Sequence, residues 1–477
     1  MQGMIATGAL ALWPLVTLVL FVTLPVGRAV IWTILAAYLL LPPMVSFDLP
    51  GIPALDKSTL PNLVALMLAP LFARRGEWRW PRSATVKLLM LVWVLVPFGA
   101  MWNNGQPIII GTSVRPGLGW WETLSAMLSN GLDLVPFLLG AALLADAKGH
   151  RDIVRALIVA ALAYSLPILA EVRLSPFLQA KLYGVVRAGY FVQQMRGDGF
   201  RAMVFLGHGL LVSTFLAMAI LGALGLSKER GTKLLGVALL PIAGFLAAVL
   251  LLNKTAGATV LVLAVAPLLM FLHQRRFLAV VFLIGAVLAS YPMVRGTNLL
   301  PLQTVIQTAE RFSPARAHSF GFRVKNEDML LKRAGEKPLF GWGRFGRNRI
   351  IVENSWSNGT TDVAPTDGTW IIVVGVFGWA GYIACFGLLC YPFLRAFRLR
   401  RMALPAATLA LVAMHLVNII DLIPNSSLRP VTWLIAGALA NMTLASLRGH
   451  KAAGQGGKMR GAPAREGALA PVSPQMA

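Results

Sequence analysis

The chain has 477 residues, of which 57% are hydrophobic and only 13% charged, and its mean hydropathy is +0.70. Soluble globular proteins carry roughly 25% charged and 45–50% apolar residues, so this composition excludes a soluble enzyme, a disordered chain and a secreted domain. The net charge of +24 would suggest nucleic acid as the partner of a soluble protein, but in a membrane protein the positions of the charges decide their meaning.

Apolar runs long enough to cross a hydrocarbon core of ~30 Å recur along the whole chain. They predict an all-α polytopic membrane protein with about 12 to 13 transmembrane helices and one long, partly helical external loop. The third run is short and interrupted by proline. The predicted spans are 8–25, 29–46, 59–73, 85–104, 122–145, 153–171, 201–226, 233–252, 256–273, 277–294, 369–394, 404–422 and 429–447.

Lys and Arg cluster in alternate short loops, as the positive-inside rule requires. The intervening loops 47–58 and 105–121 are poor in them. This parity predicts an external N-terminus and a cytoplasmic C-terminus. The basic loops carry Arg74, Arg75, Arg79 and Arg82; Lys148 and Arg151; Lys228, Arg230 and Lys233; Arg275 and Arg276; and Arg395, Arg398, Arg400 and Arg401.

The spans form one transmembrane domain, residues 1–447, in which an external loop at 295–368 joins spans ten and eleven. Residues 448–477 are rich in Gly, Ala, Pro and basic residues and are predicted to be a disordered cytoplasmic tail. The six histidines are scattered, and the two cysteines lie within one apolar run. We therefore expect no metal site and no cofactor.

Two external segments are basic. Long loops cross the membrane largely regardless of charge, so they do not disturb the parity. Ordinary solvated surface charge explains any single residue. The set as a whole suits an anionic ligand with a carbohydrate part. Arginine binds phosphate oxygens in bidentate fashion, and aromatic rings can lie against the faces of sugars. Segment 172–200 carries Arg173, Lys181, Arg187 and Arg196; segment 295–368 carries Arg295, Arg311, Arg316, Arg323, Lys325, Lys332, Arg333, Lys337, Arg344, Arg347 and Arg349, with Phe312, Phe320, Phe322, Trp342 and Phe345 among them.

Within the long loop, residues 320–334 have a helical pattern with Phe320, Val324, Leu331 and Ala334 near one face. Arg323 and Glu327 stand at i and i+4 on this predicted helix, a spacing at which they could pair.

The sequence after Pro338 contains Gly341, Gly343 and Gly346, which match G-x-G-x-x-G. A dinucleotide site is rejected, because that fingerprint requires a preceding strand in a βαβ unit. The glycines instead predict a turn whose backbone can approach a ligand closely. Trp342, Arg344 and Arg347 flank it.

Polar groups also stand at span edges. Lys254 lies between spans eight and nine, where it is either a functional cation or a lysine that reaches the membrane interface. Arg201 and His208 are seven residues apart, so on one helix they share a face and look into one cavity. The alternative for His208 is a helix–helix hydrogen bond. Glu171, and Asp421 with Arg429, are ambiguous between function and anchoring.

Several of these segments resemble, in order and topology, the O-antigen ligase and O-antigen/exopolysaccharide polymerase superfamily of bacterial inner-membrane, GT-C-like glycosyltransferases. The segments are RGDGFR at 196–201, NKTAGA at 253–258, PLFGWGRFG at 338–346 and TDGTWIIVVGVFGWAGY at 366–382. The resemblance covers roughly residues 195–395.

The resemblance implies metal-independent glycosyl transfer at the periplasmic face, with a polyprenyl-diphosphate-linked oligosaccharide as donor. It implies that Arg323, Lys254, Arg201 and Arg344 hold the diphosphate. The further substrate-binding candidates are Arg196, His208, Trp342 and Arg347. The implied surroundings are membrane lipid, a flippase and a chain-length regulator, and no nucleic acid.

One departure concerns the base. Where ligases and many polymerases have a His-Asn pair, this sequence has Thr366-Asp367-Gly368. Asp367 is the leading candidate, followed by His318 and Glu327. A cap on the helix beginning at Thr369 is the alternative role for Asp367. A polymerase of repeat units ranks above a ligase that transfers the glycan to lipid A core, and both rank above a transporter of an anionic lipid-linked sugar, which would place charges near the midplane.

Overall fold

The computed structural model describes residues 2–447 except 50, 111–112, 185–190, 192, 197–198, 298–300, 313, 355–358 and 366. The predicted cytoplasmic tail, 448–477, lies outside these residues. The structure is 69% helical with little strand, and it confirms an all-α polytopic membrane protein.

The described apolar helices correspond one for one to the predicted spans. Seven are long enough to cross a membrane: α1 (Gln2–Ala11) with α2 (Trp13–Thr23), α5 (Ala84–Trp102), α6 (Trp120–Leu143), α7 (Ala147–Leu174), α10 (Gly209–Ser227), α13 (Gln274–Gly296) and α16 (Thr369–Arg398). Six are shorter: α3 (Val26–Leu40), α4 (Thr59–Phe72), α11 (Leu239–Leu252), α12 (Ala256–Phe271), α17 (Ala406–Asp421) and α18 (Pro430–Ala440).

The remaining described elements lie in the loops. They are three helices, α8 (Leu178–Tyr183), α14 (Leu302–Phe312) and α15 (Pro314–Gly335), and five antiparallel hairpins. The hairpins pair β1 (Ser46–Phe47) with β2 (Leu55–Asp56), β3 (Ile108–Ile110) with β4 (Ser113–Arg115), β5 (Met195–Arg196) with β6 (Gly199–Phe200), β7 (Lys233–Leu234) with β8 (Val237–Ala238), and β9 (Ile351–Asn354) with β10 (Gly359–Asp362).

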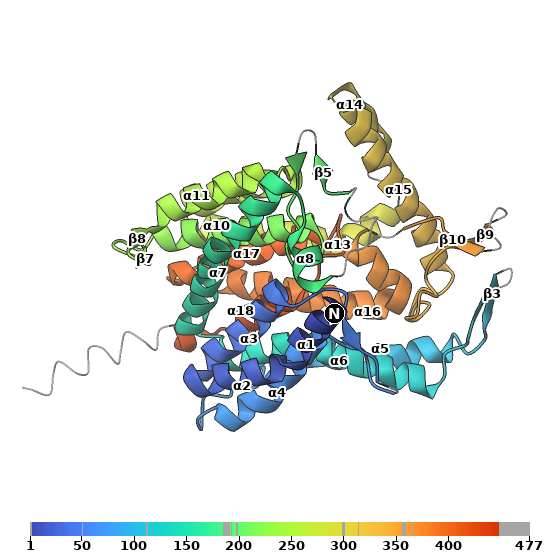
Figure 1. The fold of residues 1–477 in the computed structure, drawn as a ribbon, viewed down its shortest axis with the longest axis horizontal. Helices are drawn as coiled ribbons and strands as arrows, with labels where there is room; N and C mark the ends of the chain where they lie inside the picture. The colour runs from blue at the N-terminus through green and yellow to red at the C-terminus, as the bar shows by residue number, and fades with distance from the viewer. Residues whose placement is uncertain are drawn as a thin grey trace, which may run out of the picture.

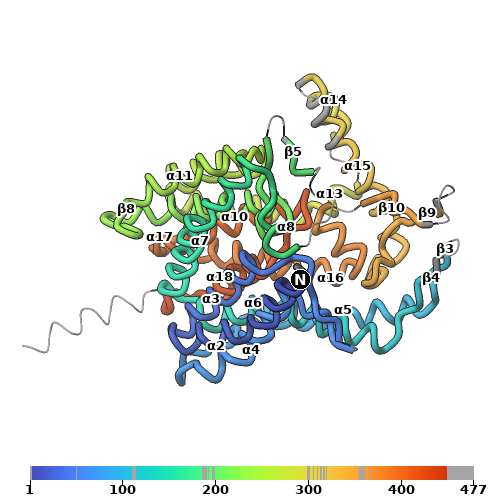
Figure 2. The backbone as a smooth tube through the Cα atoms, in the orientation of Figure 1, coloured from blue at the N-terminus to red at the C-terminus, as the bar shows by residue number. Residues whose placement is uncertain are grey.

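Loops of opposite parity lie at opposite ends of the bundle. In Figure 1 the β7–β8 hairpin, from a predicted cytoplasmic loop, lies at the left, whereas β3, β9, β10 and α14 lie at the right. Figure 2 shows the late helices α17 and α18 between the N-terminal helices and α10–α11. The alternation read from the basic loops therefore agrees with the arrangement of the helices.

The centre of the bundle is held by close helix contacts through small residues. A Cβ atom on Gly437 of α18 would lie 1.9 Å from the carbonyl oxygen of Phe137, and one on Gly140 of α6 would lie 2.3 Å from that of Leu434. Only glycine permits this approach between helices, as is common in membranes. This close packing fixes the position of α18 against α6, and with it the position of Arg429, the residue that precedes α18.

The start of span seven differs from the prediction. The helix begins at Gly209, and residues 201–208 form a turn in which Val204 has φ +46° and Gly207 has φ +81°. The buried carboxylate of Glu171 accepts the backbone N–H groups of Met203 (2.9 Å) and Val204 (2.7 Å) and holds this turn. Arg201 and His208 therefore do not share a helix face, because apolar residues in a turn were counted as helix.

The glycine-rich turn at 338–346 packs on a break in α16. Gly378 has φ +62° inside that helix, and the free backbone groups on either side of it pair with the turn. The Trp342 N–H donates to the Gly375 carbonyl (2.9 Å), and the Trp379 N–H donates to the Pro338 carbonyl (2.8 Å). The close approach that the glycines provide is thus to α16.

The three glycines of the motif form the predicted turn, with φ +69° at Gly341, +79° at Gly343 and +69° at Gly346. A Cβ atom on Gly341 would lie 2.6 Å from the Val376 carbonyl oxygen and the Gly378 nitrogen. The motif therefore attaches the external segment to a membrane-spanning helix.

Candidate functional site

A cavity of about 990 Å³ opens where loops of predicted external parity meet. Five parts of the chain that are far apart in the sequence supply its walls. They are the end of α3 with the segment before α4, the segment from α8 to the start of α10, α15, the segment just before α16, and the turn between α17 and α18. Its polar lining comprises Asp56, Lys57, Ser58, Gln179, Gln193, Arg201, His208, Arg323, Asp367, Asn425, Ser426, Ser427 and Arg429.

Cationic groups outnumber carboxylates in this lining. The cations are Lys57, Arg201, Arg323 and Arg429, and the carboxylates are Asp56 and Asp367. Because like charges repel, gathering cations in a partly enclosed space has a cost that a bound anion offsets. The arrangement therefore suits a ligand with more than one negative charge.

Arg201 is held in the wall by the segment that precedes it. Its side chain is 4% exposed, and it donates from Nε to Gln194 Oε1 (2.9 Å) and from Nη2 to the Gln193 carbonyl (3.2 Å). The first residue of α10 must be small for this placement, since a Cβ atom on Gly209 would lie 2.6 Å from Arg201 Nε.

Lys57 and Arg429 are two further cations in the lining. Lys57 is buried and donates to the Phe205 carbonyl (2.9 Å), and its ammonium lies 5.7 Å from the Tyr38 ring centroid. Burial first, and then the positive charge of Arg429, lower the pKa of Lys57 to about 7. Lys57 therefore changes charge near neutral pH.

Arg429 stands at the N-terminus of α18, and its buried Nε has no hydrogen-bond partner among the described residues. The turn that carries it is anchored by Asp421, which is buried and accepts hydrogen bonds from Asn425 (2.7 Å) and Thr214 (3.3 Å). An arginine with an unused donor beside a cavity is equipped to bind an anion.

Helices also direct their N-termini toward this space. The residues immediately before α4, α10, α16 and α18 are Ser58, His208, Gly368 and Arg429. Three of them line this cavity, and Gly368 lines a smaller cavity that shares Arg323 and Asp367 with it. The partial positive charge of a helix N-terminus favours an anion. His208 caps its own helix, because its Nδ1 accepts the Leu210 N–H (3.1 Å).

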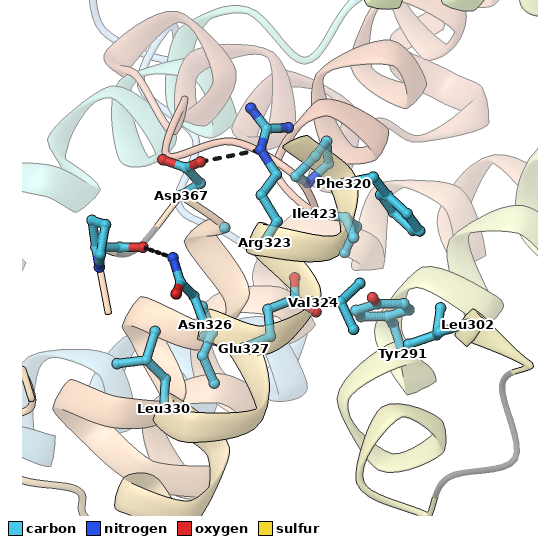
Figure 3. A pocket seen from close by; sticks show the side chains of 14 residues that line it. Tyr291, Leu302, Phe320, Arg323, Val324, Asn326, Glu327, Leu330, Asp367 and Ile423 are labelled. Carbon is cyan, nitrogen blue, oxygen red and sulfur yellow. Dashed lines mark hydrogen bonds and ion pairs between the residues drawn. The ribbon is translucent and has the colours of Figure 1, made fainter. Parts of the chain in front are cut away.

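Arg323 and Asp367 form an ion pair at the edge of the cavity, with Arg323 Nε 3.2 Å from Asp367 Oδ2 (Figure 3). Both side chains are partly exposed, 38% and 53% respectively, so each remains accessible to a ligand. The same two residues also line a smaller hollow of about 110 Å³ beside Tyr291. The capping role considered for Asp367 is wrong, because the N-cap of α16 is Gly368.

Glu327 does not pair with Arg323, which corrects the i,i+4 prediction. It pairs with Arg295 (3.2 Å), a buried residue of α13 that also contacts Asp328 (2.6 Å). Burial raises the pKa of Glu327, although Arg295 opposes the shift. These contacts hold α15 against α13, with Arg323 in the lining of the cavity. The helix α15 begins at Pro314 rather than at the predicted residue 320.

The other residues of the glycine-rich turn have structural partners. Arg347 is 3% exposed and donates to the carbonyls of Pro116 (2.6 Å) and Gln106 (2.9 Å). The Trp342 indole donates to the Arg333 carbonyl (2.7 Å), and the Arg333 guanidinium lies 3.3 Å from its ring centroid. Neither is among the described residues that line the large cavity.

Three more candidates lie elsewhere. Lys254 is exposed with φ +52°, and its Nζ lies 2.8 Å from where a Cβ of Gly199 would stand. It is not among the described residues of the cavity lining, and neither is His318, which is exposed on α15. The side chain of Arg196 falls outside the described residues. Arg344 contacts Asp133 (3.4 Å) and lines a second cavity.

Sequence reasoning missed Lys57 and left Arg429 as an anchor. Lys57 stood in a loop with Asp48 and Asp56, so it entered only the count of loop charges. Its partner Phe205 is 148 positions away, and no local pattern signals that contact. No family model matches the sequence, and no curated protein matches it.

Proposed function

We propose that this protein is a glycosyltransferase that uses a sugar chain linked to a lipid diphosphate as its donor. The observation that carries the proposal is the convergence of Lys57, Arg201, Arg323 and Arg429 on one cavity of about 990 Å³. A diphosphate is a compact multivalent anion, and arginine forks match its oxygens. The cavity is lined by residues of the membrane-spanning helices and their loops. In the proposed complex the diphosphate enters this cavity while the polyprenyl chain remains in the bilayer.

In the proposed reaction an acceptor hydroxyl oxygen attacks the anomeric carbon of the donor sugar. A new C–O bond forms, the bond from that carbon to the diphosphate oxygen breaks, and the lipid diphosphate leaves with the electron pair. The arginines stabilise the negative charge that develops on the leaving group. The acceptor proton passes to a carboxylate.

Asp367 is the best placed of the candidate bases. It lines the cavity, half of its side-chain surface is exposed, and it lies beside Arg323, which would contact the leaving group. Glu327 is engaged by Arg295 and lines only the smaller hollow. His318 is exposed on α15. Asp367 is therefore the accessible carboxylate in the cavity that could accept the acceptor proton.

The parity of the basic loops supports an orientation with the cavity on the non-cytoplasmic side. The resemblance to the O-antigen ligase and polymerase superfamily supports a bacterial inner membrane, in which that side is the periplasm. Under this proposal the chain polymerises lipid-linked repeat units into an O-antigen or exopolysaccharide. A flippase would deliver the units, and a chain-length regulator would act on the same product.

The test is reconstitution of the purified chain in vesicles with its lipid-linked repeat unit. We expect a ladder of longer lipid-linked chains, and we expect Arg323→Gln to abolish it. Arg349→Gln is the matched control, because Arg349 lies on the same external segment in an exposed pair with Asp362 (3.8 Å) outside the cavity lining.

Other products would assign other functions. Transfer of one glycan to lipid A core without a ladder would indicate a ligase, which shares the donor. Movement of the donor across the bilayer without any new glycosidic bond would indicate a transporter and would refute the proposal.

A further inference from the structure

A second cavity of about 450 Å³ adjoins the large one. It lies between α4, α5, α6 and α18, and the two share Asp56, Ser58 and Arg429 in their linings. We call it the side chamber. Its volume falls within the range of roughly 300–1,000 Å³ typical of small-molecule sites. None of its residues outside this shared set has a part in the function proposed above.

Hydroxyl and charged side chains line the side chamber. Ser58, Ser125 and Ser129 are among them. The side chains of Asp133 and Arg344 are 39% and 32% exposed, so an occupant can reach both. Such a lining offers donors and acceptors to a hydrogen-bonding occupant.

The side chamber reaches deep into the bundle. Asp133 lies 13 residues beyond Trp120, the first residue of α6, which places it roughly 20 Å along that helix at 1.5 Å per residue. Its side chain is nevertheless 39% exposed. An ionisable residue at that depth is expensive unless it faces a polar cavity and serves a function.

The charge of the side chamber differs from that of the large cavity. Asp56 and Asp133 balance Arg344 and Arg429, and Arg344 contacts Asp133 at 3.4 Å. An anion would meet two carboxylates here, and an alkyl chain would leave the polar atoms unsatisfied. Neutral hydroxyls act as donors and acceptors at once, so they suit the Asp133 carboxylate and the Arg344 guanidinium alike.

We infer that the side chamber is a binding site for the uncharged, hydroxyl-rich part of a glycan, with the large cavity taking the anionic diphosphate. This inference rests on the proposed function and deepens it by dividing the substrate between two compartments. Arg429 lies at the boundary and contacts both.

The test uses two probes on the full chain in nanodiscs, with affinities measured by saturation-transfer NMR. One is the repeat-unit oligosaccharide freed from its lipid, and the other is undecaprenyl diphosphate without sugar. Ser129→Trp places a bulky ring in the side chamber, since Ser129 lines it. Leu128→Trp is the matched control, because Leu128 is the neighbouring residue of α6 and is 46% exposed on the outer surface of the bundle.

We expect Ser129→Trp to weaken oligosaccharide binding at least tenfold and to leave undecaprenyl diphosphate binding within about twofold. Leu128→Trp should change neither.

Oligosaccharide affinity unchanged in Ser129→Trp would overturn the inference. If undecaprenyl diphosphate binding still required Arg323 in that case, the proposed function would stand without the side chamber. If the wild-type chain bound neither probe, both would fall. If it bound the oligosaccharide through the side chamber and showed no affinity for undecaprenyl diphosphate, the sugar site would stand and the diphosphate donor would fall.

Discussion

Replacement of Asp367 by Asn separates a chemical role from a structural one. Asn has nearly the same shape as Asp, but it cannot accept a proton at neutral pH. The carboxylate has one described ion-pair partner, Arg323 at 3.2 Å, and it does not occupy the N-cap of α16. The substitution thus removes one ion pair and one proton acceptor, and leaves the helix start unchanged.

The two losses differ in magnitude. An ion pair between side chains that are 38% and 53% exposed contributes about 0–1 kcal/mol to stability. A general base contributes about 10²- to 10⁴-fold in rate, or ~3–5 kcal/mol of transition-state stabilisation. We therefore expect Asp367→Asn to fold with a melting temperature within a few degrees of wild type and to form glycosidic bonds at least 100-fold more slowly.

The assay is the initial rate of bond formation at saturating donor and acceptor, with thermal unfolding measured on the same preparation. Asp362→Asn is the control, because Asp362 pairs with Arg349 (3.8 Å) outside the cavity lining and should retain the full rate. A rate for Asp367→Asn within threefold of wild type would refute the role of Asp367 as the base and direct attention to Glu327.

Further predictions concern the motif, pH and topology. Gly341→Ala should lower stability by about 2 kcal/mol or more, because φ is +69° and the new methyl would lie 2.6 Å from the backbone of α16; Gly335→Ala, in open space, should be neutral in the same thermal unfolding experiment. Lys57 has a pKa lowered to about 7, so it is cationic below that pH and neutral above it. The affinity for undecaprenyl diphosphate should therefore fall by up to about tenfold between pH 6 and 8 in wild type and more shallowly in Lys57→Arg, which keeps its charge; equal slopes in a titration would contradict this. In spheroplasts an impermeant thiol reagent should label Thr360→Cys and spare Lys233→Cys, since β10 and β7 lie at opposite ends of the bundle and the native Cys385 is buried; the reverse pattern would invert the topology.

The spans and their alternation were predictable from the sequence because hydropathy and loop charge are local quantities. The largest boundary error, at span seven, arose where residues 201–208 are mostly apolar but form a turn. Their backbone is held by Glu171, which lies on the preceding span. The apolar composition of residues 201–208 suggested a helix, but the hydrogen bonds from their backbone to the Glu171 carboxylate hold them in a turn.

The candidate site was predictable only in part. The resemblance and the charge of the long loop identified Arg201, Arg323 and Asp367, all of which line the large cavity. Spacing assigned Arg323 to Glu327, but Arg295 on another helix takes Glu327 and frees Arg323 for Asp367. The i,i+4 rule gives a preference of a few tenths of a kcal/mol, which tertiary contacts easily exceed. The role of Lys57 could be recognised only in the structure, where its ammonium donates to the Phe205 carbonyl and lies in the cavity lining.

The shortness of α18 has a consequence for the strength of charge interactions in this protein. Its 11 residues extend about 16 Å, half of a hydrocarbon core of ~30 Å, and Asn441 beyond its far end bonds to Arg82 in a predicted cytoplasmic loop. If that loop lies at the cytoplasmic face, Arg429 at the near end of α18 would lie well below the opposite face of the membrane. Two charges 4 Å apart interact by about 1 kcal/mol in water but by about 4 kcal/mol at the effective dielectric constant near 20 that suits protein sites. Such pairs are also screened less by salt. A diphosphate held at Arg429 would remain bound at ionic strengths that release the same anion from an exposed basic surface.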